Sequence, residues 1–565
     1  MLLTLLCWIY ITAICQIWGN IILSPFKKRI ATFDEPDISI ICFTGLAGIG
    51  VLSLAASVFM PLSLTAHLLI LGFAIAYILI PNNRKQIVQQ LTLVARRLQR
   101  LQSFLLFTAC VLLILILGTY EIIHPDTLEY HAQAIRLMEQ YKAIPGLVHL
   151  RYETAMTCMW FSMQAIFRFN FIHPNNYLFV NGCVLCWFCL FVCLKVTSVE
   201  NKQPDAKGKI NYQFTAWLLL LIYTVLSWTQ LRLTAVSASP DFITTLYIWA
   251  AFYSFSQTGS GNNRVYTFLT VLFCCTALSI KLSAIAIALL PLLIVLKLFT
   301  QKKIKTALLI MGGSVLTMLP YLIRNIITTG YPLFPSTAFN LFNCDWKLNE
   351  LQLYRFQHYI RAYARFPVAG YDEAEKALQL PISKWIPLWW NELALPDQVL
   401  LCIILALSLY YLITLKTNIR QQGYTGAVML IVALTGSVLW MIMAPAPRFG
   451  TGFLVPLCYS VGTSLKNGSL LRSLFDKQRI INIIIISVSA AMVIYTGYRV
   501  VYYFKPLQIV LPAGVKKTVY STVNCQGLKF SVSDQCGFAP TPCIEDSCEH
   551  YILRGTDISD GFKEK

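Results

Sequence analysis

Long runs of apolar residues, separated by short polar segments, recur along almost the whole chain of 565 residues. A helix needs roughly 20 apolar residues to cross the hydrocarbon core of a bilayer. About fourteen runs approach that length, so the pattern predicts an all-α polytopic membrane protein. The predicted spans are residues 2–24, 38–60, 62–81, 102–123, 176–197, 213–234, 240–257, 265–280, 282–300, 305–323, 398–415, 424–443, 449–465 and 480–503.

Basic residues gather in the connections between these runs, and the net charge of the chain is +19. Short cytoplasmic loops of membrane proteins carry an excess of Lys and Arg. Because the basic residues are spread over loops and form no compact basic domain, we expect no nucleic-acid partner. The basic clusters lie at residues 27–29, 84–100, 195–209, 302–305, 416–420 and 466–479.

All these clusters fall on one side of the membrane if residues 152–170 do not cross it. This segment carries Glu153, Gln164 and Arg168 among apolar residues, and we expect an amphipathic helix on the outer surface. The resulting orientation predicts a multi-pass membrane protein, with its longest loops and its C-terminal tail on the outer face.

The predicted orientation divides the chain into five parts. They are accessory N-terminal helices with a basic cytoplasmic loop (1–101), a helical core (102–325) with a first outer loop (124–174), a long outer loop (326–397), C-terminal helices (398–503) and an outer tail (504–565).

Most of the eighteen cysteines lie inside apolar runs, where they behave as small buried hydrophobic residues. Four others lie close together in the polar tail, and an even number in a short segment outside the cytoplasm predicts two disulfides. Residues 518–523 and 528–532 have the alternation of short strands, so the tail is predicted to be a small β-containing domain. The disulfide candidates are Cys525, Cys536, Cys543 and Cys548.

Ionisable residues are concentrated directly after the predicted span 102–123, in the string Ile122-Ile123-His124-Pro125-Asp126-Thr127-Leu128-Glu129-Tyr130-His131. Charged side chains are costly inside a membrane, so a cluster at its edge indicates chemistry at the water–lipid boundary. If a helix starts at Pro125, Asp126, Glu129 and Tyr130 share one face and His131 lies on a neighbouring face. A carboxylate here could act as a general base, or Asp126 could only cap the helix.

Further charged residues stand at the predicted outer ends of later spans. Asp241 opens one span, and Lys281 interrupts an apolar run. Asp241 could be only a helix start signal, and Lys281 could extend to the lipid interface. Arg324-Asn325 and Arg448 lie on the outer side, against the positive-inside trend. Arginine matches the geometry of phosphate well, although contact with lipid headgroups is the simpler alternative.

The order of these motifs resembles the GT-C superfamily of membrane glycosyltransferases, which includes the protein O-mannosyltransferases and the lipid A aminoarabinose transferase. The resemblance covers about residues 102–465, and it extends to a bacterial family of GT-C-like membrane proteins of unassigned function. It implies a bacterial inner-membrane protein whose site faces the periplasm. Two features depart from the superfamily: three extra helices precede the core, and the first-loop motif is an unusual variant. The matching positions are Asp126, Asp241, Lys281-Leu282-Ser283-Ala284, Arg324, Asn325, Gly330, Pro332, Pro335, Arg448 and Phe449.

The resemblance implies transfer of a sugar from a polyprenyl-phosphate donor to a hydroxyl group on a glycolipid, glycan or protein acceptor, with inversion at the anomeric carbon. It leaves open whether a divalent metal assists, and no metal ligand is predicted. The implied catalytic residues are Asp126, Glu129 and Asp241. The implied substrate- and phosphate-binding residues are Tyr130, His131, Lys281, Arg324, Asn325 and Arg448.

Two other functions are compatible with the sequence. A transporter or flippase of a lipid-linked saccharide would suit the number of helices, but such proteins place polar groups near the midplane and contain repeats, and no convincing repeat is evident. A polymerase or ligase of the O-antigen type would use mainly the long outer loop, where Arg355, His358, Arg361 and Arg365 lie among aromatic residues.

Overall fold

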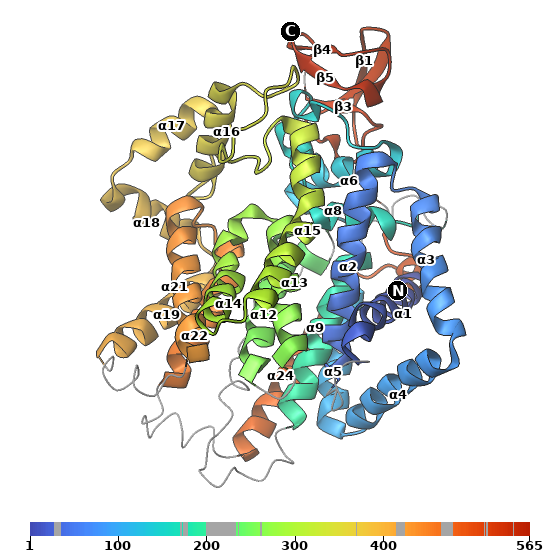
Figure 1. Cartoon of the computed structure of the whole chain (residues 1–565), viewed down its shortest axis with the longest axis vertical. Helices are drawn as coiled ribbons and strands as arrows, with labels where there is room; N and C mark the ends of the chain where they lie inside the picture. Colours follow the sequence, from blue (N-terminus) through green and yellow to red (C-terminus); the bar gives the residue numbers. More distant parts are fainter. Residues whose placement is uncertain are drawn as a thin grey trace.

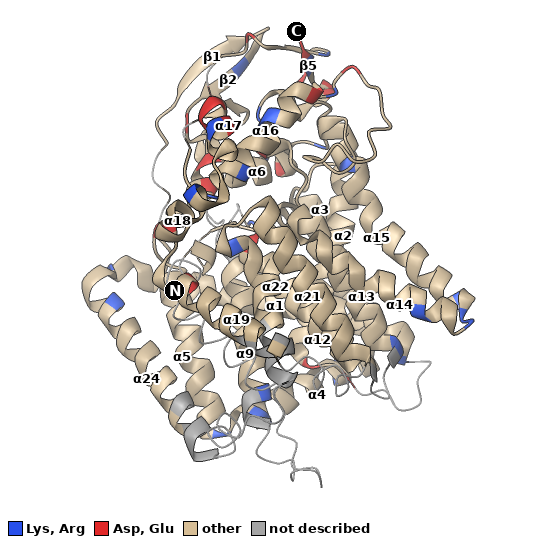
Figure 2. Ribbon diagram, turned by 90° about the vertical axis from the view of Figure 1, so that its left-hand side faces the viewer, with Lys and Arg blue, Asp and Glu red and all other residues tan. Residues whose placement is uncertain are grey.

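The apolar runs fold into long helices that stand side by side, as the computed structural model in Figure 1 shows. Most charged side chains gather at the two ends of this bundle and leave its middle largely uncharged (Figure 2). This is the distribution expected of helices whose central part lies in hydrocarbon. The structure describes residues 1–27, 35–169, 172, 179–198, 233–235, 237–259, 263–368, 370–413, 424–464, 478–513, 515, 518–545 and 547–565.

Among these described residues, five helices are long and apolar enough to cross a membrane. A sixth candidate is a pair of helices bent by 96° at the break between them. The protein is therefore a plausible membrane protein, but the expected number of about fourteen spans is not confirmed. Most of the expected span 213–234 lies outside the described residues.

The five candidate spans differ in their bounds from the sequence prediction by at most six residues, whereas the bent pair continues beyond the predicted span 62–81 because much of the expected basic loop is helical. The five are α1 (Leu2–Lys27), α2 (Ile38–Phe59), η5 with α14 (Leu282–Ala288 and Leu289–Thr300), α15 (Ile304–Thr329) and α21 (Tyr424–Met443), and the bent pair is α3 (Leu64–Leu79) with α4 (Pro81–Leu98). Helices with shorter apolar stretches are α5 (Leu101–Leu117), α9 (Phe179–Ser198), α13 (Asn263–Ile280) and α19 (Leu395–Ile413).

Helix α12 (Asp241–Ser256) lies inside the bundle and carries a key acidic residue at its first position. Every residue from Asp241 to Phe255 is buried, as expected of a helix that is apolar on all sides. Its neighbours include α13 and α22 (Pro447–Ser464), while α24 (Gln478–Tyr503) packs against α5. Elsewhere α1 and α2 approach so closely that a Cβ at Gly45 would lie only 1.8 Å from the carbonyl oxygen of Cys15. The absence of a side chain at Gly45 permits this contact.

The expectation of one amphipathic helix on the outer surface at residues 152–170 is wrong. The segment forms two short helices, α7 (Tyr152–Ala155) and α8 (Met159–Ile166), and all eight residues of α8 are buried. Its polar residues find partners inside the protein instead of in water. Gln164 donates to Asn181 Oδ1 over 2.6 Å, and the Ser162 hydroxyl lies 3.0 Å from that of Ser53.

The long outer loop forms three helices that stand beside the outer end of the bundle (Figure 1). Trp389 connects this loop to the bundle, because its indole N–H donates to the carbonyl oxygen of Pro445 over 2.9 Å. Pro445 lies two residues before the start of α22, so this contact supports the start of that helix. The three helices are α16 (Glu350–Tyr363), α17 (Tyr371–Gln379) and α18 (Ile382–Glu392).

The tail contains the expected small β region, at the end of the molecule opposite α4 (Figure 1). Strand β1 (Ser521–Cys525) pairs antiparallel with β2 (Leu528–Val532), and β3 (Cys543–Ile544) runs parallel to β2. A second pair consists of β4 (Tyr551–Leu553) and β5 (Phe562–Glu564). The four tail cysteines form the disulfides Cys525–Cys548 and Cys536–Cys543.

The tail packs on the first outer loop and shares a hydrophobic core with it. The amide of Phe562 donates to the carbonyl oxygen of Pro145 over 2.9 Å. The short helix η7 (Cys536–Phe538) lies on the residues that follow Asp126. A Cβ at Gly537 would come within 2.4 Å of the carbonyl oxygen of Thr127, so only glycine permits this contact.

The contact at Gly537 can be tested by adding one methyl group. We expect Gly537→Ala to lower the unfolding free energy by about 1–3 kcal/mol, the usual effect of overpacking, because backbone atoms must move apart. Gly370→Ala is the matched control, since nothing lies within 4 Å of a Cβ at that position. Thermal unfolding of the purified variants measures the effect, and equal melting temperatures for both variants would contradict the packing described above.

The orientation can be tested with the native thiol of Cys344, in the long outer loop, and with a new thiol in α4. A membrane-impermeant maleimide applied to whole cells should label Cys344 but not Gln89→Cys, whose side chain is exposed at the other end of the molecule. Cys344→Ser identifies the signal of the native thiol. Labelling of Gln89→Cys from outside intact cells would reverse the predicted orientation.

Candidate functional site

The first polar string forms a helical segment that differs from the expected α-helix. Residues Thr127–His131 form the π-helix η1, which continues into α6 (Ala132–Gln140). Single π-turns within helices occur frequently at functional sites. Asp126 stands at the N-cap position of η1 but makes no side-chain capping hydrogen bond, so any capping role would rest on its charge near the helix start alone.

A buried ion pair joins the start of α12 to the junction between α13 and η5. The Lys281 ammonium donates to the Asp241 carboxylate, and the backbone of Lys281 is extended where the helix is interrupted. The ammonium also lies 3.5 Å from the centre of the Phe449 ring, a cation–π geometry. The Lys281 side chain therefore turns toward protein partners and not only toward lipid.

Arg448, the second residue of α22, connects this ion pair to the first outer loop. Its Nε lies 3.4 Å from Asp241 Oδ2, and its Nη2 lies 3.8 Å from Asp126 Oδ2. Two carboxylates and two cations from four separate segments thus meet at one place. We call these side chains the charged cluster: Asp126, Asp241, Lys281 and Arg448.

The two acids of the charged cluster differ in how far their side chains are exposed to solvent. The side chain of Asp241 is 9% exposed, whereas that of Asp126 is 26% exposed. The exposed fractions of Lys281 and Arg448 are 27% and 29%. Asp241 is therefore placed to hold the two cations from within the protein, while Asp126 and the cations can be reached by a ligand.

Two histidines and a tyrosine surround the charged cluster. Burial lowers the pKa of His124 and lowers the pKa of His131 well below its ordinary value, which favours neutral rings. His131 Nδ1 lies 3.0 Å from the Thr127 hydroxyl, and its ring meets that of Tyr130 edge-on at 4.5 Å. Burial and then the charge of Asp126 raise the pKa of Tyr130 well above 10.0.

Glu129 belongs to a neighbouring group of charges. Its carboxylate lies 3.8 Å from the guanidinium of Arg151, which also contacts Glu153 at 3.3 Å and Glu545 of the tail at 2.7 Å. Burial, followed by the charge of Asp126, raises the pKa of Glu129. Asp126 and Glu129 therefore have different cationic partners, and the catalytic role of Glu129 stays a prediction.

Arg324 and Asn325 make contacts of another kind. The Arg324 guanidinium is 3% exposed and donates to the Ser57 carbonyl and hydroxyl oxygens at 3.0 and 2.9 Å. Asn325 Oδ1 accepts from the amide of Thr157, and its side-chain amide donates to the carbonyl oxygen of Pro332. These bonds connect α15 to α2 and to the outer loops. A phosphate-binding role for the two residues stays a prediction, and the structure adds a packing role.

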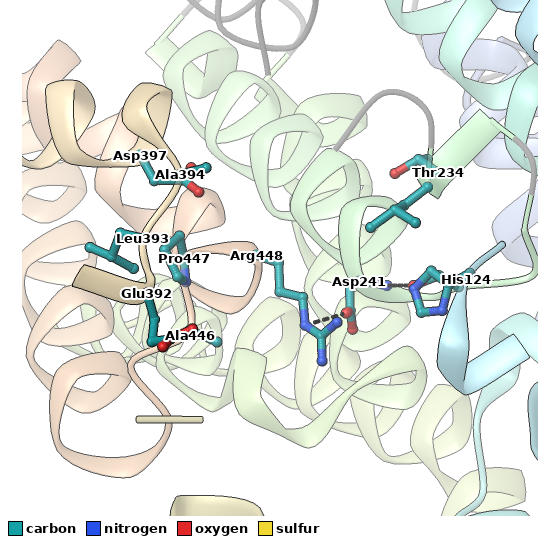
Figure 3. A pocket seen from close by; sticks show the side chains of 12 residues that line it. His124, Thr234, Asp241, Glu392, Leu393, Ala394, Asp397, Ala446, Pro447 and Arg448 are labelled. Atoms are coloured by element: carbon teal, nitrogen blue, oxygen red, sulfur yellow. Dashed lines mark hydrogen bonds and ion pairs between the residues drawn. The ribbon is translucent and has the colours of Figure 1, made fainter. Parts of the chain in front are cut away.

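A cavity of about 230 Å³ opens beside the charged cluster, and Figure 3 shows the side chains that line it. Arg448 and Asp241 meet near its centre, with His124 behind Asp241 and the segment from Glu392 to Asp397 on the opposite wall. The lining residues are His124, Leu233, Thr234, Ser239, Asp241, Glu392, Leu393, Ala394, Asp397, Ala446, Pro447 and Arg448.

The fit of a divalent metal can be judged from the donor groups. Within the described part of the chain, no three His, Cys, Asp or Glu side chains are grouped as a metal site requires. Asp126 and Asp241 also have cationic partners already. These residues do not fit a metal site, and we derive no step through a metal ion.

Sequence reasoning missed three residues of this region. His124 was part of the first string but received no role, although its position two residues before Asp126 was a signal. Arg151 lies on the outer side against the positive-inside trend, the same signal that drew attention to Arg324. Asp397 lines the cavity from the end of the long outer loop, and nothing in its local sequence marks it.

Comparison with known proteins shows the family of this chain. It belongs to the family described as "Domain of unknown function (DUF8201)", whose model matches residues 1–455. No curated protein matches the chain, and no solved structure matches it. The match includes every member of the charged cluster and ends before the tail.

The coupling between Asp241 and Lys281 can be measured with a double-mutant cycle. Lys281→Met and Asp241→Asn should each lower thermal stability, because each leaves an ion without its nearest partner. The double variant should recover part of the loss, with a coupling energy of about 1–3 kcal/mol. Purified variants in one detergent provide the comparison, and additive effects of the two substitutions would contradict the pair.

Proposed function

We propose that the protein is a membrane glycosyltransferase that moves a sugar from a polyprenyl-phosphate donor to a hydroxyl group of a glycolipid, glycan or protein acceptor at the outer face of the membrane. The observation that supports this proposal is the charged cluster beside the cavity. It brings an accessible carboxylate and two accessible cations together at one end of an apolar bundle.

Asp126 is the general base in this proposal. Its carboxylate takes the proton of the acceptor hydroxyl as the acceptor oxygen forms a bond to the anomeric carbon of the sugar. The bond between that carbon and the phosphate oxygen breaks, and its electron pair leaves with the polyprenyl phosphate. A single displacement of this kind inverts the anomeric carbon.

Arg448 and Lys281 stabilise the phosphate that leaves. Charge on the phosphate increases as the bond to the sugar breaks, and fixed cations at that position lower the barrier more than they stabilise the bound donor. Asp241 keeps both cations in place. Its carboxylate is more buried than that of Asp126, so Asp126 is the acid that an acceptor can reach. Tyr130, whose ring contacts that of His131, lies close enough to Asp126 that, after burial, the charge of that carboxylate contributes to its raised pKa.

The proposal can be tested against the flippase alternative through its need for a base. Asp126→Asn keeps the size of the side chain and removes its charge, so we expect sugar transfer to fall about 10²–10⁴-fold, the usual contribution of a general base. Membranes that carry the variant are incubated with a lipid extract of a deletion strain as the source of donor and acceptor. Mass spectrometry then measures the glycan formed per unit of protein.

Asp372→Asn is the matched control, because the same substitution falls on an exposed residue of α17. It should leave transfer unchanged. Undiminished transfer by Asp126→Asn at a normal protein level would contradict the proposed mechanism, since a flippase requires no base at this position.

A further inference from the structure

Nδ1 of the His124 imidazole is a buried polar atom without a hydrogen-bond partner in the described part of the chain. The residue as a whole is 2% exposed. The ring lines the cavity beside Asp241 (Figure 3). His131 differs, because its ring nitrogen lies at hydrogen-bond distance from Thr127. Buried polar groups are nearly always satisfied, so His124 indicates that a ligand supplies its partner.

A second buried polar atom beside the same cavity also lacks a hydrogen-bond partner among the described residues. It is Nε of Arg448, and Asp241 lies 3.4 Å away as an ion-pair partner. The Lys281 ammonium is already bound to Asp241. The contacts of Arg448 to the two acids are long, at 3.4 and 3.8 Å. Arg448 can therefore bind a ligand with a smaller loss of interaction energy within the protein than Lys281 can.

The chemistry of these groups selects the ligand. A neutral imidazole has one N–H donor, and a guanidinium has only donors. An oxyanion with several oxygen atoms can accept from both, and phosphate fits a guanidinium particularly well. The carboxylates of Glu392 and Asp397 lie on the opposite wall of the cavity (Figure 3). On the side of Arg448 the carboxylate of Asp241 also lines the cavity, but its charge is compensated by Lys281.

We propose that this cavity binds the phosphate of the lipid-phosphate donor, with His124 donating a hydrogen bond from its ring to a phosphate oxygen beside Arg448. The inference rests on the proposed function and adds a donor-binding residue to it. His124 acts in binding and holds the phosphate while Asp126 remains available to the acceptor. Apolar lining residues such as Leu393 and Pro447 border the same cavity, as a prenyl chain requires.

Binding of farnesyl phosphate to the purified full-length protein tests this inference, with farnesol and inorganic phosphate as comparison probes. Wild-type protein should bind farnesyl phosphate and not farnesol. His124→Phe keeps a ring but removes the donor, and should weaken binding about 10- to 100-fold, as expected for a hydrogen bond to a charged group. His124→Gln retains an N–H donor and should restore part of the affinity. His358→Gln, on α16, is the control and should bind as wild type does.

The outcomes separate the inference from the proposed function. If wild-type protein does not bind farnesyl phosphate, both are contradicted. If wild type and His124→Phe bind it equally, the role of His124 is wrong while the proposed function stands. If inorganic phosphate binds as tightly as farnesyl phosphate, the cavity takes free phosphate and the assignment to a lipid donor is wrong. Melting curves of both His124 variants verify that they are folded.

Discussion

The buried carboxylate of Asp241 is the constraint on which the outer end of the bundle depends. An ionised group removed from water must be compensated, and here Lys281 and Arg448 compensate it from two other segments. Because Lys281 lies where one helix is interrupted and Arg448 lies where another begins, the ion pairs fix the positions of both. Asp126 reaches the same place through Arg448, and the charges of the charged cluster then sum to zero.

The tail adds further contacts to this arrangement. It lies beyond the residues that the family model matches, yet η7 rests directly on η1, and Arg151 connects Glu129 to Glu545. The disulfide Cys536–Cys543 closes the loop that carries Gly537. The segment that bears Asp126 is therefore held by an ion pair to the helical bundle and by backbone packing against the tail.

Much of this arrangement could be predicted because local patterns carry it. Apolar runs indicated the helices, and charges at their ends pointed to all four residues of the charged cluster, together with Glu129 and Arg324, which have other partners in the structure. The π-turn that begins at Thr127 was not predicted, and it lies against η7, which is distant in sequence. The burial of α8 was missed because its polar residues pair with Ser53 and Asn181, which only the tertiary structure supplies. Arg324 has the same sequence signal as Arg448, but its guanidinium contacts Ser57 of α2.

The lipid-linked sugars of a deletion strain provide the most direct test of the central claim, that the charged cluster transfers a sugar from a lipid-phosphate donor. Mass spectrometry of its membrane lipids and surface glycans should find the unused polyprenyl-phosphate sugar accumulated, together with loss of that one sugar from a surface glycan or glycolipid. Unchanged lipids and glycans would contradict the account. So would accumulation of a complete lipid-linked saccharide confined to the inner leaflet, because that result identifies a defect in transport.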